Sequence, residues 1–492
     1  MGKRIAILGA GISGLAAAQR ILRQNADNPS ERRVQFTIFD PSSRVGGVIS
    51  TRRDEGFLVE ESSDNFITTM PWAVDLCDEL GLKASLRGTD PAYRRTFVVC
   101  RGRLRPLPDG FLMMAPTRLW PMALTPILSP LGKIRAAMEY FLPRRVDSSD
   151  ESVRAFATRR LGREVFERLI EPLVSGVYAA DMERLSVAAT LPQFREMEQK
   201  YRSLIRAMRV NMSNRRREER SWRRSGGASD TGARYSLFMT PREGLETIPL
   251  AIRALVEKSP DATLCLGTGV DRVAWDSAGT YRVFRTDGAT EVFDGVIFAA
   301  PSHATASIVR DMDPLLSSEL SQITHSGTAV LTVAFRADQV RTPAHGAGAV
   351  VPSIERLPIL AISFSNHKYP FRSPQGTVLL RVFAGGVQNQ ALFEQDDASL
   401  QRTLLDALRP LLSITGDPIY ATMARWPRTM PQYHIGHKDL IATIRERVST
   451  YPGLAIAGNF LDGVGIPQCI HNGQLAAGSV AAHCRSIIPL PR

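Results

Sequence analysis

A glycine-rich turn between an apolar run and a run of small residues is the most constraining feature of this sequence. The letters KRIAIL, beginning at Lys3, predict a short buried strand, and LAAAQRIL, beginning at Leu15, predicts a helix. The letters GAGISG join the two, beginning at Gly9. Strand, glycine turn and helix in this order are typical of a dinucleotide-binding corner. The glycines argue against a secretion signal, in which an apolar run leads to a cleavage site.

The three glycines have different roles in such a corner. Gly9 allows the tight turn, Gly11 lets a pyrophosphate approach the backbone, and Gly14 lets the helix pack closely on the strand. Unpaired N–H groups and the helix dipole then favour the anion. A second predicted strand, VQFTIFD, ends at Asp40, whose carboxylate is placed to accept hydrogen bonds from ribose hydroxyls. The candidate residues here are Gly9, Ala10, Gly11, Ile12, Ser13, Gly14 and Asp40.

Two further segments favour FAD over NAD. The letters PSSRVGG follow Asp40 and add a second strip of close backbone approach with a cation beside it. The letters GLAIAGNFLDGVGIPQ, beginning at Gly453, predict a strand, a glycine-rich loop and a helix from about Pro467. The N-terminus of that helix can stabilise the anion formed when an isoalloxazine accepts a hydride. The added candidates are Arg44, Gly46, Gly47, Ala457, Gly458, Val464, Gly465 and Ile466, with Val270 passing the adenine.

Composition limits the partners of the chain. A formal charge of +12 suits nucleic acid, an anionic membrane surface or an acidic small molecule. Much of the excess lies in NRRREERSWRR at 214–224, which predicts a solvated loop. Trp222 is its one aromatic residue, so we expect no nucleic-acid binding. The 5 cysteines and 8 histidines are dispersed, and we expect no metal site.

The pattern of predicted elements indicates an α/β (α+β) fold in three parts. A discontinuous Rossmann-type FAD-binding domain takes residues 1–80, 239–302 and 445–492. A mixed-sheet substrate domain takes residues 81–108, 195–238 and 303–444. Residues 109–194 are helix-like and apolar, and form either an internal core or an α-helical membrane-binding domain. In the second case lipid phosphates would meet Arg118, Lys133, Arg135, Arg144 and Arg145.

Several segments spread over the chain resemble one enzyme family. They are LGAGISGLAAA at 8–18, SSRVGG at 42–47, GRLRPLPDGF at 102–111, EPLVSGVYAADMERLSVAATLPQF at 171–194, PREGLETIP at 241–249, GAGAVVPS at 346–353, MPQYHIGH at 430–437 and AGNFLDGVGIPQCIHNGQLAA at 457–477. With these segments the chain resembles the oxygen-dependent protoporphyrinogen oxidases, within the flavin amine-oxidase-like superfamily. The segments at 171–194, 430–437 and 457–477 are specific to that family.

The resemblance implies an FAD enzyme of haem biosynthesis. Such an enzyme oxidises protoporphyrinogen IX to protoporphyrin IX in three two-electron steps, and O2 is reduced to hydrogen peroxide. The resemblance also implies a homodimer at the cytoplasmic face of the cell membrane, with ferrochelatase, the next enzyme, as a partner. Flavin N5 takes the hydride, so we expect no essential acid–base side chain.

The resemblance suggests further residues for the substrate site. Asp64 is a weak catalytic candidate, because Ser62 and Ser63 stand where relatives have Gly-Pro. A basic residue that binds a substrate propionate corresponds to Arg95, although Arg94 fits almost as well. The candidate wall residues are Phe66, Leu173, Gly176 and Phe364.

Three alternative functions stay open from the sequence. Coproporphyrinogen III oxidase, which forms coproporphyrin III, uses the same chemistry on a substrate with four propionates instead of two. A flavin amine oxidase would need an aromatic cage beside the flavin, and no pair of aromatics suggests one. A basic membrane- or nucleic-acid-binding protein with a vestigial Rossmann fold would not hold flavin.

Overall fold

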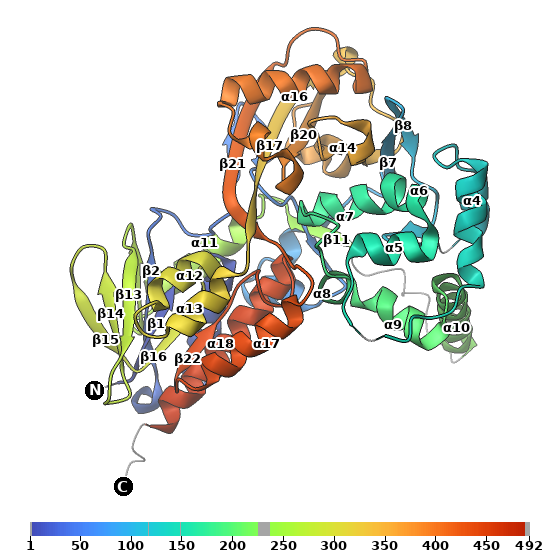
Figure 1. The fold of residues 1–492 in the computed structure, drawn as a ribbon. Coiled ribbons are helices and arrows are strands. Elements are labelled where there is room, and N and C mark those ends of the chain that lie inside the picture. Colours follow the sequence, from blue (N-terminus) through green and yellow to red (C-terminus); the bar gives the residue numbers. More distant parts are fainter. Residues whose placement is uncertain (1, 117, 148, 225–236, 488–492) are drawn as a thin grey trace.

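Strand β1 (Arg4–Leu8) lies at the centre of a five-stranded parallel sheet. The strand order is β12 (Ala262–Leu266), β2 (Gln35–Asp40), β1, β16 (Gly295–Phe298) and β22 (Leu454–Ile456). Strands from the start, middle and end of the sequence therefore build one sheet, which Figure 1 shows at the lower left. The computed structural model describes residues 2–116, 118–147, 149–224 and 237–487.

Alternation along β1 sends side chains to two apolar layers. Ile5 and Ile7 pack with helices α1 (Ile12–Ala26), α11 (Thr247–Lys258) and α18 (Ile466–Ser486). Ala6 and Leu8 face a second cluster built on strands β13 (Val270–Trp275), β14 (Tyr281–Arg285) and β15 (Thr290–Phe293). Helices α12 (Ser302–Val309), α13 (Pro314–Ser321) and α17 (His437–Ser449) belong to this second cluster. They lie in residues that we grouped mainly with the substrate domain, whose boundaries stay a prediction.

A seven-stranded sheet forms the second part, at the top of Figure 1. Its order is β21 (Tyr420–Pro431), β17 (His325–Arg336), β20 (Thr377–Gly385), β19 (Ala361–Phe364), β18 (Gly346–Val350), β7 (Arg95–Cys100) and β8 (Arg103–Pro106). Strands β18 and β7 pair in parallel, and the other neighbours are antiparallel. Helix α16 (Asp397–Leu412) packs its leucines on one face of this sheet.

Short elements connect the two large sheets. They comprise the hairpin β3 (Thr51–Asp54) and β4 (Phe57–Glu60), helix α2 (Trp72–Glu79), and a small sheet of β5 (Phe66–Ile67), β11 (Phe238–Pro241) and β6 (Leu86–Gly88). Two more helices, α14 (Ser365–Lys368) and α15 (Gln390–Phe393), flank β20, and a short turn η7 (Pro370–Arg372) follows α14. Other short turns are η1 (Ser30–Arg32), η2 (Lys83–Ser85), η5 (Ala337–Gln339), η6 (Ser353–Glu355) and η8 (Val387–Asn389).

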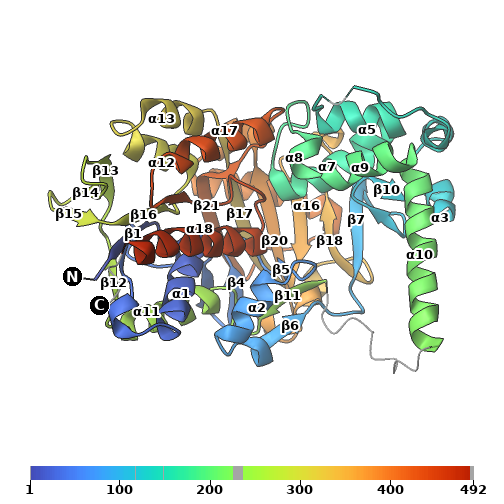
Figure 2. The same cartoon turned by 90° about the horizontal axis from the view of Figure 1, so that it is seen from below.

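The third part is mostly helical and lies at the right of Figure 2. Its helices are α3 (Leu119–Leu124), α4 (Pro130–Ala137), α5 (Val153–Leu161), α6 (Arg163–Val165), α7 (Glu171–Tyr178), α8 (Val187–Thr190), α9 (Pro192–Tyr201) and α10 (Leu204–Arg224). The hairpin β9 (Phe111–Leu112) and β10 (Ala115–Pro116), the 3-10 helix η3 (Met138–Tyr140) and the π-helix η4 (Phe166–Ile170) complete it. In the described part of the chain, no helix has the length and hydropathy to cross a bilayer.

The basic stretch at 214–224 corrects one prediction. We expected a solvated loop, but these residues are the last turns of α10. Arginine and glutamate are good helix formers, and charges of opposite sign at helical spacing add support. Residues 225–236, which include the SGGASDTG stretch, lie outside the described residues.

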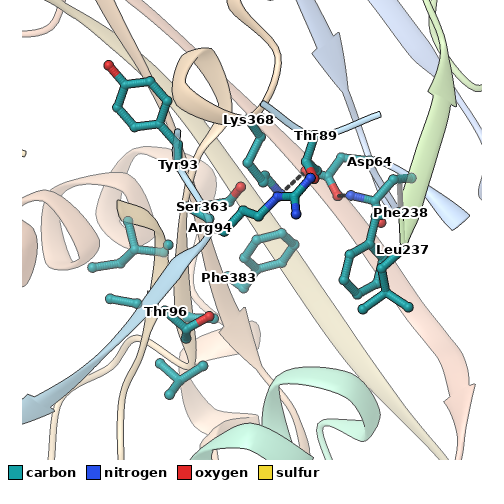
Figure 3. Close-up of a pocket in the computed structure, with 17 residues that line it drawn as sticks. Asp64, Thr89, Tyr93, Arg94, Thr96, Leu237, Phe238, Ser363, Lys368 and Phe383 are labelled. Atoms are coloured by element: carbon teal, nitrogen blue, oxygen red, sulfur yellow. Dashed lines mark hydrogen bonds and ion pairs between the residues drawn. The ribbon is translucent and has the colours of Figure 1, made fainter. Parts of the chain in front are cut away.

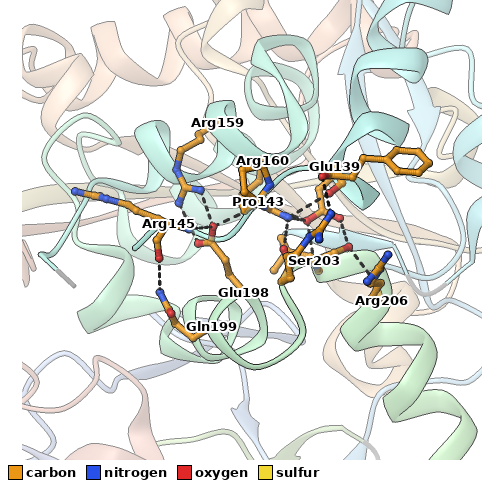
Figure 4. A network of polar contacts seen from close by, with 12 residues as sticks. Glu139, Pro143, Arg145, Arg159, Arg160, Glu198, Gln199, Ser203 and Arg206 are labelled. Carbon is orange, nitrogen blue, oxygen red and sulfur yellow. Dashed lines mark hydrogen bonds and ion pairs between the residues drawn. The ribbon is translucent and has the colours of Figure 1, made fainter. Parts of the chain in front are cut away.

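A buried ionic network joins the helices of the third part (Figure 4). Arg160 and Glu139 are both fully buried and form an ion pair. Glu139 also accepts hydrogen bonds from Ser203 Oγ at 2.6 Å and from the Leu204 N–H at 2.8 Å. Because Leu204 begins α10 and Ser203 directly precedes it, the network fixes that helix against η3 and α5.

Candidate functional site

The glycine corner lies where β1 passes into α1. Gly9 has a φ of +117°, and a Cβ there would lie 2.7 Å from the carbonyl oxygen of Ala299. A Cβ on Gly14 would lie 1.9 Å from the carbonyl oxygen of Gly9. Gly11 differs, because its φ is −69° and a Cβ would meet no atom within 4 Å. The space beside Gly11 can therefore hold a ligand.

The segment after β2 closes against this corner. Asp40 accepts a hydrogen bond from the Ala10 N–H at 2.7 Å, and the Gly46 N–H donates to the Ala10 carbonyl oxygen at 2.8 Å. Gly46 also forms a β-bridge with Gly11. A Cβ on Gly47 would lie 3.3 Å from the Gly11 Cα. The structure thus brings Asp40 and both glycines of RVGG to the corner.

Helix α18 lies directly against α1 (Figure 2). A Cβ on Gly473 would lie 2.0 Å from the carbonyl oxygen of Ser13, so glycine permits this contact. No side chain caps α1 at Gly11 or α18 at Gly465, and neither helix has an acidic residue in its first turn. The two helix N-termini are therefore suited to anionic groups of a long cofactor.

The other predicted cofactor residues are spread around these helices. Ala457 is fully buried after β22, and the carbonyl oxygen of Gly458 accepts a hydrogen bond from Asn472 Nδ2 at 3.3 Å. Val270 begins β13 and packs against the nucleotide-binding sheet. Arg44 donates to three backbone carbonyl oxygens of its own loop, at 2.6–3.3 Å. Val464 and Ile466 flank the cap of α18.

A cavity of about 530 Å³ lies between the seven-stranded sheet and the segments at 64–65 and 237–238 (Figure 3). Much of its wall is apolar and includes Ala347, Ala349, Val350, Ala361, Ile362 and Phe383. Its polar lining includes Asp64, Asn65, Thr89, Tyr93, Arg94 and Lys368. Such a cavity suits a flat apolar ligand that carries a few polar or anionic groups.

Asp64 is surrounded by cations. It pairs with Lys368, and it lies 3.4 Å from Arg381 Nη1 and 3.8 Å from Arg372 Nη1. Burial raises the pKa of Asp64, but these three cations outweigh it and hold that pKa well below its ordinary value. Burial also lowers the pKa of Lys368, which the charge of Asp64 opposes. Asp64 is therefore ionised at neutral pH and is unsuited to accept a proton.

The two arginines also fix the backbone of the loop that carries Asp64. Arg381 donates to the Ser62 carbonyl oxygen, and Arg372 Nη2 donates to that of Asp64 at 2.8 Å. Glu60, which is buried, lies 3.3 Å from Arg372 Nη2, and burial raises its pKa. The loop at 62–64 is thus held by hydrogen bonds from two buried arginines to its backbone.

The residues predicted for the substrate lie in different surroundings. Both arginines are exposed, and of the two only Arg94 is part of the cavity lining, while Arg95 begins β7. Phe66 and Phe364 are buried in the cores of the two large sheets. Leu173 packs on the helical core. A Cβ on Gly176 would lie 3.8 Å from Val350, a residue of the cavity wall.

Sequence reasoning missed the three cations around Asp64. Lys368 and Arg372 follow β19 in a segment that resembles any polar surface turn. Arg381 had a visible signal, because it interrupts the apolar run VLLRVFAG, which forms most of strand β20. A charge in such a run indicates a buried ion pair or a ligand site.

Three comparisons relate the chain to known proteins. The sequence profile of the family described as "Flavin containing amine oxidoreductase" matches residues 12–481. The chain is 32% identical to coproporphyrinogen III oxidase of Bacillus subtilis over 98% of both chains. It is 30% identical to protoporphyrinogen oxidase 1 of Arabidopsis thaliana, covering 94% of this chain and 85% of that protein. The structure of a candidate protoporphyrinogen oxidase from Exiguobacterium sp. 255-15 is similar, with a TM-score of 0.83, 29% identity and coverage of 98% and 99%.

Proposed function

The chain belongs to the flavin containing amine oxidoreductase family, and on this premise we propose that it oxidises a porphyrinogen, with coproporphyrinogen III as the substrate. Membership confirms the predicted flavin cofactor, the oxidoreductase activity and the FAD-binding fold. The observation that carries the proposal is the match to coproporphyrinogen III oxidase of Bacillus subtilis over 98% of both chains. The sequence alone placed protoporphyrinogen IX first.

The proposed reaction removes six electrons and six protons from the substrate in three two-electron steps. Three molecules of O2 become three of hydrogen peroxide, and coproporphyrin III is released. When bound, FAD accepts a hydride from the substrate and passes the electrons to O2. The open side of Gly11 and the uncapped N-terminus of α1 fit its pyrophosphate. The uncapped N-terminus of α18 fits an anionic isoalloxazine.

The cavity residues bind and orient the macrocycle. The apolar wall, with Val350 and Phe383, excludes water from the reacting carbon. Arg94, at the rim, is placed to bind a propionate. Asp64 does not accept the proton released in each step, because three cations keep it ionised. It holds the position of Lys368 instead.

The same charges argue against an amine substrate. An ammonium ion needs a free carboxylate or an aromatic cage. The Asp64 carboxylate is already paired with Lys368, and Arg94 adds a second positive charge at the cavity. The positive charges of Lys368 and Arg94 both repel a cation and attract an anion.

The test is direct. Purified holoenzyme receives coproporphyrinogen III or protoporphyrinogen IX, and porphyrin fluorescence and hydrogen peroxide are followed together. We expect faster turnover of coproporphyrinogen III, with three peroxides for each porphyrin. A yellow protein that oxidises neither compound contradicts the proposal.

Protoporphyrinogen IX is the second candidate substrate. It is supported by the 30% identity to protoporphyrinogen oxidase 1 of Arabidopsis thaliana. Faster turnover of protoporphyrinogen IX in the same assay would favour it.

We also propose that the helical part binds a membrane surface. Trp120, Leu124 and Leu131 are 76–79% exposed, and Phe141 is 71% exposed. Near them, an apolar cavity of about 460 Å³ is lined by Lys133 and Arg209 among others. Exposed apolar residues beside cations suit the interface of an anionic bilayer. The cytoplasmic location, the homodimer and the ferrochelatase partner stay predictions.

Vesicle flotation tests the membrane proposal. Replacing Trp120, Leu124 and Leu131 by serine should release the protein from anionic vesicles without loss of turnover in detergent. The control is Leu315→Ser, since Leu315 is 60% exposed on α13, outside the helical part. Equal binding by the triple variant and the control would contradict the proposal.

A further inference from the structure

We propose that Lys368 binds a carboxylate of the substrate and so favours coproporphyrinogen III, with four propionates, over protoporphyrinogen IX, with two. This inference rests on the proposed function. It names the residue that would set the substrate preference of the same cavity.

Lys368 is placed to meet a ligand. It ends helix α14 and lines the cavity, although only 14% of its side chain is exposed. Its ammonium group has three N–H donors, and the Asp64 carboxylate takes one of them. Figure 3 shows Lys368 joined to Asp64 at the cavity. Asp64 therefore fixes the ammonium in place and leaves donors for a second acceptor.

The buried cluster around Lys368 has an excess of positive charge. Its cations are Lys368, Arg372 and Arg381, and its carboxylates are Asp64 and Glu60. With all five groups ionised, three positive and two negative charges leave one positive charge uncompensated. Because an unpaired buried charge is costly, such a cluster favours one more anion. A substrate carboxylate beside Lys368 would make the cluster neutral.

The arginines behind Lys368 have unused donors. Arg372 and Arg381 are each 1% exposed, and the Nε and Nη1 atoms of both have no hydrogen-bond partner among the described residues. Arg381 also lies over the ring of Phe383, which lines the cavity, at 4.9 Å. Their positive field therefore adds to that of Lys368 at the cavity wall.

A purely structural role would explain less. If Lys368 served only to neutralise Asp64, the two arginines would already suffice, since both lie within 4 Å of the same carboxylate oxygen. Of the three cations around Asp64, Lys368 is the one that lines the cavity. With Arg94 at the rim, the cavity then offers two separate cations, which suits a substrate with carboxylates on several sides.

The test compares both porphyrinogens in the FAD-loaded enzyme. For Lys368→Met we expect kcat/KM for coproporphyrinogen III to fall about 10- to 100-fold, mainly through KM, the range for one charged hydrogen bond. For protoporphyrinogen IX we expect a change of less than about 3-fold, because its two propionates can be placed elsewhere. The matched control is Lys83→Met, because Lys83 is 50% exposed and outside the cavity lining.

A double variant separates recognition from folding. Asp64→Asn with Lys368→Met removes one charge of each sign and keeps the net charge of the cluster. We expect both Lys368→Met and the double variant to lose the preference for coproporphyrinogen III, and thermal unfolding of the two variants shows that this loss does not follow a loss of the fold.

The outcomes separate this inference from the proposed function. Equal loss with both substrates would overturn the inference, since the charge would then serve the fold or the flavin. An unchanged preference in Lys368→Met would overturn it too. A wild-type enzyme that oxidises neither porphyrinogen would refute the proposed function, and this inference with it.

Discussion

Replacing Gly11 by valine should remove flavin and leave the fold intact. A Cβ at Gly11 meets no atom within 4 Å, and its φ of −69° is allowed for any residue. Valine is a poorer N-cap residue than glycine, but it also restricts the unfolded chain, so we expect stability to change by about 1 kcal/mol or less. The space beside Gly11 is therefore free in the protein and needed only by a ligand.

The expected loss of affinity follows from the same geometry. The valine side chain would occupy the approach to the uncapped N-terminus of α1, where we expect the pyrophosphate to bind. Losing two hydrogen bonds to a charged group costs about 3–6 kcal/mol, or about 100- to 10,000-fold in the dissociation constant of FAD.

Gly14→Ala gives the contrasting case. A Cβ there would lie 1.9 Å from the Gly9 carbonyl oxygen, so the strand and helix must move apart. Overpacking of this kind costs about 1–3 kcal/mol or more. We therefore expect Gly14→Ala to lower the stability of the apoprotein itself, which Gly11→Val does not.

The assay measures two quantities for each variant. Visible flavin absorbance relative to protein, with calorimetric titration of FAD into apoprotein, gives cofactor affinity. Thermal unfolding of the flavin-free proteins gives the stability of the fold. If Gly11→Val bound FAD with wild-type affinity, the pyrophosphate would lie elsewhere and the assignment of this corner would be wrong.

Three further predictions concern buried charges. Arg160→Met should lower the free energy of unfolding of the helical part by about 3–5 kcal/mol, because it leaves Glu139 buried without its cation. The control Arg163→Met, at a 76% exposed position, should change that free energy by less than about 1 kcal/mol. Denaturant titration measures both. Burial raises the pKa of Glu171 from 4.5 to about 7, so its protonated form stabilises the fold at low pH and that contribution is lost as the pH rises. As the pH rises from about 4.5 to 7, the free energy of unfolding of Glu171→Gln should rise by about 3 kcal/mol relative to that of the wild type. A difference between the two free energies that does not change with pH would contradict this. Because the pKa of Asp64 is held far below its ordinary value, kcat/KM of Asp64→Asn should be lower than that of the wild type with the same pH profile between pH 5 and 8.

The sequence predicted the cofactor corner because its requirements are local. A tight turn, a close approach and a close helix contact each demand glycine at a fixed spacing, so Gly9, Gly11 and Gly14 could be assigned before any fold was known. The joining of the two chain ends was also predictable, because strand β22 and α18 repeat the order of strand, glycine loop and helix.

The charge cluster needed the tertiary structure. Asp64 and Lys368 are 304 positions apart in the sequence, in a loop and in helix α14, and Arg381 lies on strand β20. The sequence alone cannot show whether a lysine after a strand faces water or a buried carboxylate, because tertiary packing decides whether the lysine is buried. Arg94 and Arg95 show the same limit, since both are exposed neighbours in the sequence and only Arg94 is part of the cavity lining.

A sequence therefore shows where the backbone makes a tight turn or a close approach, because glycine is the one residue that allows either. A sequence does not show the electrostatic surroundings of a side chain, because the energy of a charge depends on every group that the fold brings near it. The sequence by itself determined the glycine corner at which we expect the cofactor to bind. Tertiary structure decided which charges line the cavity, because only the fold brings Asp64, Arg94 and Lys368 together.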